Sequence, residues 1–292
     1  MTTTAFFEYE SPEIELEENF KRKFGDIPKS IMKFRKSRDL MNLIDNDELG
    51  IGTPDSLVFT KRGSGVFKDS PLRYSIYNPD QASFILQYYT EEGDLILDPF
   101  MGRATRPAVT LFHGRRYIGF DTCQATVDAN KDLLERKFPR VGLGKYRLYK
   151  GDGTELEPIR SESNKFDAVF TCPPYYNIEK YSGEDGDLSR LRPAKYDARI
   201  QELFHHLYQL IKPSQNRVHP VIFTLGSVRI KDRGLVDMDY EFHSMAEKAG
   251  FLLHDKMLTE NITPMVGFTF RRNYEQKYVC KNFETTLVFI KK

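Results

Sequence analysis

Residues 166–176 read FDAVFTCPPYY, a short apolar stretch that runs directly into two prolines and two tyrosines. Proline lacks an N–H group and fixes φ, so Pro173 and Pro174 end the strand that the apolar residues predict. In a parallel α/β sheet, ligands bind at the carboxyl ends of the strands. The carbonyls of this turn and the ring of Tyr175 suit a flat, amino-bearing ring, although an ordinary strand-to-loop exit fits the same residues.

A second stretch, GDLILDPFMGRAT at residues 93–105, has the same arrangement. The strand predicted over residues 95–97 runs into the sequence DPF. A helical pattern opens after Gly102 and extends to about Phe112. Glycine lets a backbone approach a ligand closely, and the first turn of a helix presents unpaired N–H groups. This turn is therefore a candidate ligand-binding loop.

Two further strands are predicted at residues 116–121 and 146–150. The first ends in Asp121, which is well placed to accept hydrogen bonds from ribose hydroxyls. The second is closed by the sequence GDG at 151–153. The spacing departs from G-x-G-x-x-G, and the proline and phenylalanine after Asp98 crowd the place of a pyrophosphate. The pattern favours a nucleoside without phosphates over a dinucleotide.

Taken in order, these segments resemble the S-adenosylmethionine-dependent DNA amino-methyltransferases, which methylate N6 of adenine or N4 of cytosine. The matching motifs are DPFMGRAT at 98–105, YIGFD at 117–121, GDG at 151–153 and TCPPYY at 171–176. The resemblance covers about residues 71–292. It implies an α/β fold, a doubly wound, seven-stranded, mostly parallel sheet of the class I methyltransferase type. We expect a catalytic domain at 71–292, preceded by an extension and connector at 1–70.

The resemblance also implies roles for single residues. The cofactor S-adenosylmethionine is expected to be bound by Asp98, Pro99, Phe100, Gly102, Asp121 and Asp152. The amino group of a base flipped out of double-stranded DNA is expected to be held by Cys172, Pro173, Pro174 and Tyr175, with Tyr176 contacting the substrate.

Two positions depart from the family pattern. Ala104 replaces the second glycine of the first motif, and Cys172 replaces the usual Asp, Asn or Ser before the two prolines. A thiol is a weak hydrogen-bond donor and a weak acceptor. Its shape is closest to serine, which is more typical of the cytosine-N4 enzymes. The choice between adenine and cytosine stays open.

Three other functions fit part of the pattern. A Pro-Pro-Tyr turn also serves amino-methyltransferases that act on RNA or tRNA. Cys172 could instead act as a nucleophile on a pyrimidine, with Glu260 as helper acid, although such enzymes carry Pro-Cys rather than Cys-Pro-Pro. A catalytically silent nucleic-acid-binding relative is the third alternative.

The composition is that of a globular protein, with 292 residues, 40% hydrophobic and 29% charged. No apolar run of 18 residues and no secretory signal are evident, so we expect a cytoplasmic protein without a membrane span. The three cysteines are far apart and odd in number, which predicts a reduced protein and no zinc site. The sequence leaves the oligomeric state open, with a homodimer as one option.

Charge is unevenly distributed, although the net charge is only +1. An acidic stretch at residues 8–18 precedes a basic stretch at 21–38, which suits either a phosphate backbone or internal charge pairing. The segment 268–281 interleaves basic residues with tyrosines, a pattern typical of phosphate contact and base stacking. The expected DNA-binding residues there are Arg271, Arg272 and Lys277.

Overall fold

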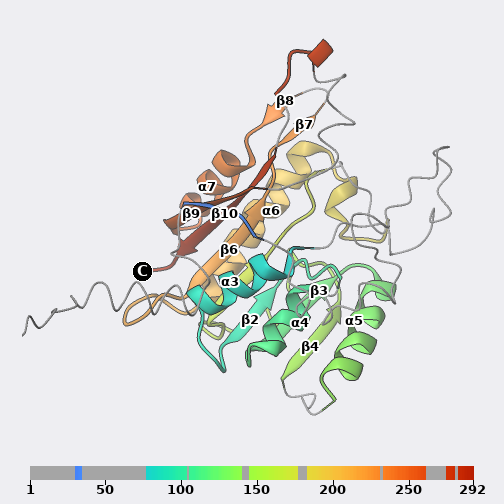
Figure 1. The fold of residues 1–292 in the computed structure, drawn as a ribbon, viewed down its shortest axis with the longest axis vertical. Helices are drawn as coiled ribbons and strands as arrows, with labels where there is room; N and C mark the ends of the chain where they lie inside the picture. The colour runs from blue at the N-terminus through green and yellow to red at the C-terminus, as the bar shows by residue number, and fades with distance from the viewer. Residues whose placement is uncertain are drawn as a thin grey trace, which may run out of the picture.

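A computed structural model describes residues 30–34, 77–103, 105–139, 145–176, 183–230, 233–260, 274–279 and 282–292. Within these residues, one eight-stranded sheet has the order β1-β9-β10-β6-β5-β2-β3-β4 (Figure 1). Neighbouring strands are parallel except where β10 pairs with β6 and with β9. The expected doubly wound, mostly parallel sheet is confirmed.

Strands and helices alternate along most of the chain. The sheet strands are β1 (Ile31–Met32), β2 (Leu95–Asp98), β3 (Arg116–Asp121), β4 (Tyr146–Lys150), β5 (Ala168–Thr171), β6 (Pro220–Leu225), β9 (Leu252–Glu260) and β10 (Phe283–Ile290). The helices are α3 (Pro79–Tyr89), α4 (Thr105–Phe112), α5 (Gln124–Lys137), α6 (Pro193–Leu210), α7 (Met238–Lys248) and a 3-10 turn η3 (Leu188–Arg190). A separate hairpin joins β7 (Val228–Ile230) to β8 (Gly234–Val236).

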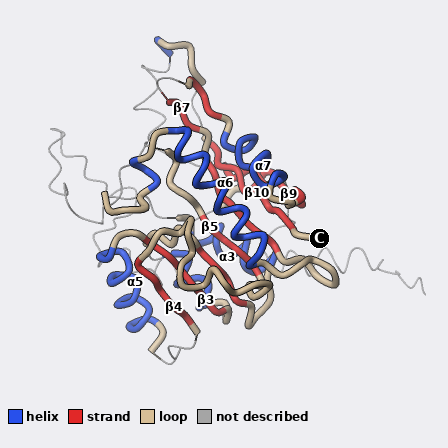
Figure 2. The backbone as a smooth tube through the Cα atoms, turned by 180° about the vertical axis from the view of Figure 1, so that it is seen from behind, coloured by secondary structure: helices blue, strands red, loops and turns tan. Residues whose placement is uncertain are grey.

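The central strands are buried on both faces because helices cover each side of the sheet. Successive strand residues point to opposite faces, so Leu95 and Leu97 join one core cluster and Ile96 joins the other. The first cluster packs against α6 and α7, and the second against α3, α4 and α5. Figure 2, seen from behind, shows α6 lying across the sheet on the face opposite α3.

The sequence pattern predicted most elements close to their observed bounds. In α3 the side chain of Asn78 accepts hydrogen bonds from the N–H groups of Asp80 and Gln81. That cap supplies acceptors for the unpaired donors of the first helical turn. Gly250, with φ +100°, follows the last turn of α7 and ends this helix.

Two features of the fold were not predicted. The sheet has eight strands among the described residues because Ile31 and Met32, in the predicted extension, pair in parallel with Leu258 and Thr259 of β9. Part of the segment 1–70 thus completes the sheet edge of the expected catalytic domain. The β7–β8 hairpin has only three residues in each strand, too few for an alternating pattern to show in the sequence.

Candidate active site

The turn after β2 is held from several sides by its own neighbours. The N–H of Phe100 donates to the carboxylate of Asp98 and to the hydroxyl of Thr171, each at 3.2 Å. The N–H of Met101 donates to the carbonyl of Phe120 at 2.8 Å. Gly102 has φ +56°, a conformation that favours glycine. The turn is therefore fixed against the tips of the strands on both sides, β3 and β5.

Asp98 is fully buried and its carboxylate is saturated with hydrogen bonds. Oδ1 accepts from the Phe100 N–H and the Thr171 hydroxyl, and Oδ2 accepts from Arg106 Nε at 2.7 Å and the Tyr117 hydroxyl at 2.8 Å. An ionised carboxylate has about four acceptor sites. Asp98 therefore supports the turn from below, and its oxygens are not free to bind a ligand.

Asp121 lies at the tip of β3 and is partly exposed. Its carboxylate accepts hydrogen bonds from the N–H groups of Cys123 at 2.8 Å and Gly102 at 3.2 Å. Burial raises the pKa of Asp121 to about 6, although these two hydrogen bonds oppose the shift. The carboxylate links the turn after β2 to the tip of β3.

The tip of β4 touches the first turn directly. A Cβ placed on Gly153 would lie 1.8 Å from the carbonyl oxygen of Pro99, so only glycine fits there. Beside it, Asp152 accepts hydrogen bonds from the N–H and hydroxyl of Thr154 at 2.8 and 2.7 Å. Asp98, Pro99, Phe100, Gly102, Asp121 and Asp152 are thus brought to one edge of the sheet, formed by the tips of β2, β3 and β4.

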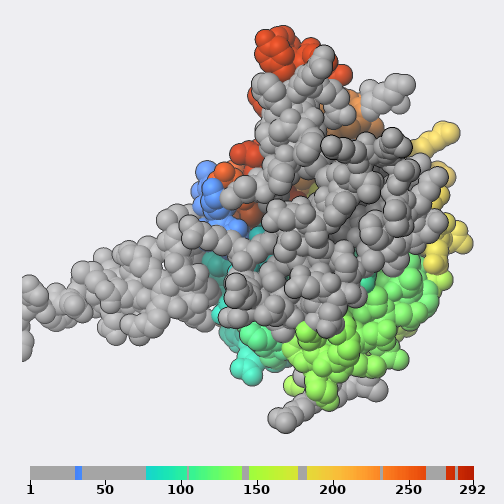
Figure 3. Space-filling view, turned by 45° about the vertical axis from the view of Figure 1, so that its right-hand side comes forward, coloured from blue at the N-terminus to red at the C-terminus, as the bar shows by residue number. Residues whose placement is uncertain are grey.

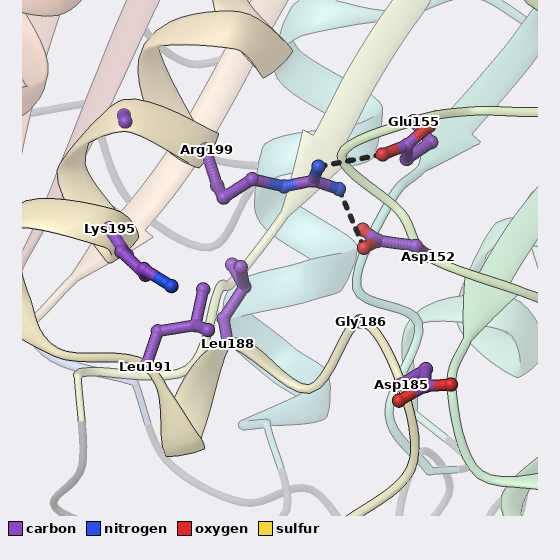
Figure 4. Close-up of a pocket in the computed structure, with 9 residues that line it drawn as sticks. Asp152, Glu155, Asp185, Gly186, Leu188, Leu191, Lys195 and Arg199 are labelled. Carbon is purple, nitrogen blue, oxygen red and sulfur yellow. Dashed lines mark hydrogen bonds and ion pairs between the residues drawn. The ribbon is translucent and has the colours of Figure 1, made fainter.

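A cavity of about 520 Å³ lies beside Asp152. Arg199 of α6 bridges Asp152 and Glu155, with nitrogen–oxygen distances of 2.7 and 2.6 Å (Figure 4). Leu188 and Leu191 supply the apolar part of the lining. None of its lining residues belongs to the proline turn, so this cavity and that turn are separate parts of the edge. Arg199 was not predicted, since it lies 47 residues from Asp152.

The proline turn follows β5, the neighbour of β2 in the sheet. The hydroxyl of Thr171 donates to Asp98 at 2.6 Å and so joins this turn to the first one. The Cys172 Sγ lies 3.3 Å from the Tyr175 hydroxyl oxygen, and the carbonyl of Pro174 accepts a hydrogen bond from Tyr196 at 2.7 Å. The residues 98–102 and 172–175 therefore stand on adjacent strand tips.

The electrostatics of the proline turn keep its thiol protonated at neutral pH. Burial raises the pKa of Cys172 to about 11, with a further rise from the negative charge of Glu284 and an opposing effect of Arg106. Thiolate is the nucleophilic form of cysteine. The environment of Cys172 is thus poorly suited to nucleophilic attack and compatible with hydrogen bonding.

Tyr176 is placed differently from the rest of the turn. It is 1% exposed, and its hydroxyl donates to Asp197 of α6 at 2.6 Å. The Arg233 guanidinium also contacts this hydroxyl and Asp197, at 3.3 and 3.0 Å. In the structure Tyr176 anchors the turn to α6, and its contact with substrate stays a prediction.

The expected DNA-binding residues are only partly described. Arg271 and Arg272 lie outside the described residues. Lys277 is exposed, has φ +56°, and holds its Nζ 4.3 Å from the ring centroid of Tyr274. Nearby in sequence, Tyr278 lies under the guanidinium of Arg229 in β7, at 3.6 Å. The segment 274–279 stands at the top of the molecule in Figures 1 and 3, above the β7–β8 hairpin.

The described residues hold no cluster of three or more His, Cys, Asp or Glu side chains that could bind a metal ion. In the same part of the chain, no helix is long and apolar enough to cross a membrane.

Two comparisons at the level of sequence match part of this chain. The family model of the N6/N4-type DNA methylases matches residues 76–132, which include the first turn and Asp121. The Type II methyltransferase M.MthZI of Methanothermobacter thermautotrophicus is 24% identical over 147 residues, which are 50% of this chain and 39% of that protein. Both matches support the DNA amino-methyltransferase family that the sequence motifs indicate. The matched part of the chain spans about two fifths of the length of that curated relative.

Comparisons at the level of structure concern the fold. The [4+2]-cyclase SpnF superposes with a TM-score of 0.50 at 14% identity, covering 73% of this chain and 80% of SpnF. Phosphoethanolamine N-methyltransferase 2 of Haemonchus contortus, solved with S-adenosyl-L-methionine, has a TM-score of 0.45 at 16% identity, covering 73% and 52% of the two chains. The expected class I methyltransferase fold is confirmed.

The sequence predicts S-adenosylmethionine as the cofactor, and the match to the DNA methylase model supports it. The residues at the edge fit that molecule. Asp121 presents a partly exposed carboxylate suited to ribose hydroxyls. No neighbouring atom comes closer than 3.9 Å to a Cβ placed on Gly102, so a ligand can approach this backbone. The Asp98 carboxylate supports the shape of the turn through its hydrogen bonds, and its contact with the cofactor stays a prediction.

Proposed function

We propose that this protein transfers a methyl group from S-adenosylmethionine to the exocyclic amino nitrogen of adenine or cytosine in DNA. The observation that carries the proposal is the hydrogen bond between Thr171 and Asp98, which joins the cofactor-side turn to the proline turn. Bound S-adenosylmethionine supplies an electrophilic methyl group. The protein supplies a fixed position for the acceptor beside it.

The base must leave the duplex to reach this edge, because its amino nitrogen is hidden in the stack. The lone pair of that nitrogen is delocalised into the ring, which makes it a weak nucleophile. Hydrogen bonds from its N–H groups to the Pro173 carbonyl and to the side chain at position 172 would favour a tetrahedral nitrogen. The ring of Tyr175 would fix the plane of the base by stacking.

The tips of β2, β3 and β4 would hold the cofactor. The Gly102 backbone would lie at the methionine end, Asp121 would accept hydrogen bonds from the ribose, and Asp152 would lie beside the adenine ring. The cavity next to Asp152, with Leu188 and Leu191 in its wall, offers an apolar surface for that ring.

The neutral Cys172 thiol favours direct transfer over covalent catalysis. A nucleophilic cysteine normally has a pKa near or below neutrality, whereas burial raises the pKa of Cys172 to about 11. A protonated thiol can still take part in a hydrogen bond, as its 3.3 Å contact with the Tyr175 hydroxyl shows.

Double-stranded DNA would contact the protein beyond the proline turn. Lys277 and the stacked pair Arg229–Tyr278 gather positive charge and aromatic rings at the top of the molecule. Arg271 and Arg272 belong to the same stretch of sequence. We assign phosphate contact to these basic groups and stacking to the tyrosines.

The test is methyl transfer with purified protein, methyl-labelled S-adenosylmethionine, and either duplex DNA or total RNA. Nucleoside analysis is expected to find the label in N6-methyladenine or N4-methylcytosine from DNA. Tyr175→Ala is expected to abolish transfer, while Tyr240→Ala, at an exposed position on α7, is the matched control. Label found only in RNA, or at carbon 5 of cytosine, would contradict the proposal.

A further inference from the structure

The turn after β2 carries two arginines, Arg103 and Arg106, whose surroundings differ sharply. Arg106 is buried, and its guanidinium forms three hydrogen bonds within the turn. Its Nε bonds Asp98 at 2.7 Å, and its Nη2 donates to the carbonyls of Phe100 and Met101. The negative charge of Asp98 raises the pKa of Arg106 against the effect of burial. Arg106 therefore belongs to the frame of the turn.

Arg103 lacks such a partner. Its Nη1 is buried and has no hydrogen-bond partner, and no ion pair of Arg103 occurs among the described residues. Burial lowers the pKa of Arg103, opposed only by the nearby Cys123. A buried guanidinium nitrogen without a hydrogen-bond acceptor is costly. The missing partner is thus an acceptor, most favourably an anion, that the described residues do not provide.

The backbone around Arg103 is pinned, so its position is well defined. The peptide groups on both sides of Gly102 are held, because the Gly102 N–H donates to Asp121 and the Gly102 carbonyl accepts from Asn130 at 2.6 Å. The carbonyl of Arg103 itself accepts from the N–H of Thr105 at 2.8 Å. Arg103 is therefore fixed between the tips of β2 and β3, at the start of α4.

We propose that Arg103 binds the carboxylate of the methionine moiety of S-adenosylmethionine and makes binding depend on that group. The inference rests on the proposed use of this edge for the cofactor. A guanidinium matches a carboxylate geometrically and forms two parallel hydrogen bonds with it. A DNA phosphate is the less suitable anion, because the free nitrogen is buried near Cys123 rather than on the outer surface.

The experiment compares two cofactors that differ only in this carboxylate. Calorimetric titration is performed with S-adenosylmethionine and with decarboxylated S-adenosylmethionine, which keeps the sulfonium and the amino group. Proteins are the wild type, Arg103→Gln, Arg103→Lys, and the control Arg116→Gln. Arg116 is exposed at the opposite, amino-terminal end of β3.

The wild type is expected to bind S-adenosylmethionine more tightly than the decarboxylated form. Losing a charged hydrogen bond costs about 1.5–3 kcal/mol, so Arg103→Gln should weaken S-adenosylmethionine binding roughly 10- to 100-fold. Its affinity for the decarboxylated form should stay unchanged. Arg103→Lys should retain part of the preference for S-adenosylmethionine over the decarboxylated form. Arg116→Gln should retain all of this preference.

The inference is overturned if Arg103→Gln keeps the wild-type preference, or if it weakens both cofactors equally. It is also overturned if the variant binds S-adenosylmethionine normally but binds duplex DNA less tightly, since Arg103 would then contact phosphate. If the wild-type protein binds neither cofactor, the proposed function itself is refuted. This result is distinguishable from the outcomes above, in which the wild type binds a cofactor.

Discussion

The guanidinium of Arg106 and the carboxylate of Asp98 form a buried ion pair, with Nε and Oδ2 2.7 Å apart. The pair joins the first turn of α4 to the last residue of β2. Because Arg106 also donates to the Phe100 and Met101 carbonyls, it closes the turn between the two elements. The shape of the cofactor-side turn therefore depends on an ion pair beneath it.

Arg106→Met should lower the free energy of unfolding by about 3–5 kcal/mol, because it leaves the Asp98 charge buried without its cation. Urea denaturation measures this change. The control is Lys131→Met, which breaks an exposed pair with Glu135 at 3.9 Å and should cost less than about 1 kcal/mol. Equal effects of the two substitutions would show that the buried pair contributes little.

Gly153→Ala should destabilise the protein, because the new Cβ would lie 1.8 Å from the backbone oxygen of Pro99. Overpacking of this kind costs about 1–3 kcal/mol. Gly151→Ala, two residues earlier, is the matched control, since its Cβ would meet only Phe120 at 3.8 Å. Thermal melting of both variants measures the difference, and a stable Gly153→Ala protein would refute the contact between the tips of β2 and β4.

The strand tips were predictable from the sequence because each one is marked locally. Proline or glycine follows the apolar strand at Pro99, Gly151 and Pro173. Asp98 directly precedes Pro99, and Asp152 directly follows Gly151. Parallel pairing then brings the tips to one edge of the sheet. The structure confirms this arrangement for β2, β3, β4 and β5.

The partners of these acids were not predictable, because they come from distant parts of the chain. Arg199 reaches Asp152 across 47 residues, and Tyr117 reaches Asp98 across 19. Arg106 pairs with the carboxylate of Asp98, and a charged residue at the start of an apolar helix was the signal for this pair in the sequence. The edge strand Ile31–Met32 was too short to leave a periodic pattern.

Cys172→Ser should retain methyl transfer, because the thiol is protonated near neutral pH and serves as a hydrogen-bonding group. Loss of one hydrogen bond in Cys172→Ala should reduce the initial rate up to about tenfold. Cys123→Ser is the control for general effects of cysteine substitution. Complete loss of transfer in both Cys172 variants, together with a stable adduct to a 5-fluoropyrimidine substrate, would instead indicate covalent catalysis.

Asp121 should make stability depend on pH. Its pKa in the folded protein is about 6, above the ordinary value of 3.8, so folding favours its protonated form. The contribution of Asp121 to the free energy of unfolding is fully present below about pH 4 and is lost as the pH rises through about 6. The free energy of unfolding of the wild type, relative to Asp121→Asn, should therefore fall between pH 4 and 6 and then level off.

Urea titrations at several pH values measure that dependence. The same substitution at the exposed Asp132 of α5 is the control for a general effect of removing one negative charge. A difference between wild type and Asp121→Asn that stays constant from pH 4 to 7 would show that the carboxyl group is not shifted by its surroundings.

We expect the tips of β2, β3 and β4 to form the binding site for S-adenosylmethionine. Calorimetric titration of S-adenosylhomocysteine into the wild type and into Asp121→Ala measures binding at this site. We predict one binding site per chain in the wild type, and affinity weaker by roughly tenfold or more in the variant, since charged hydrogen bonds to the ribose are lost. Absence of binding to the wild type, or equal affinity in both proteins, would show that these strand tips do not bind the cofactor.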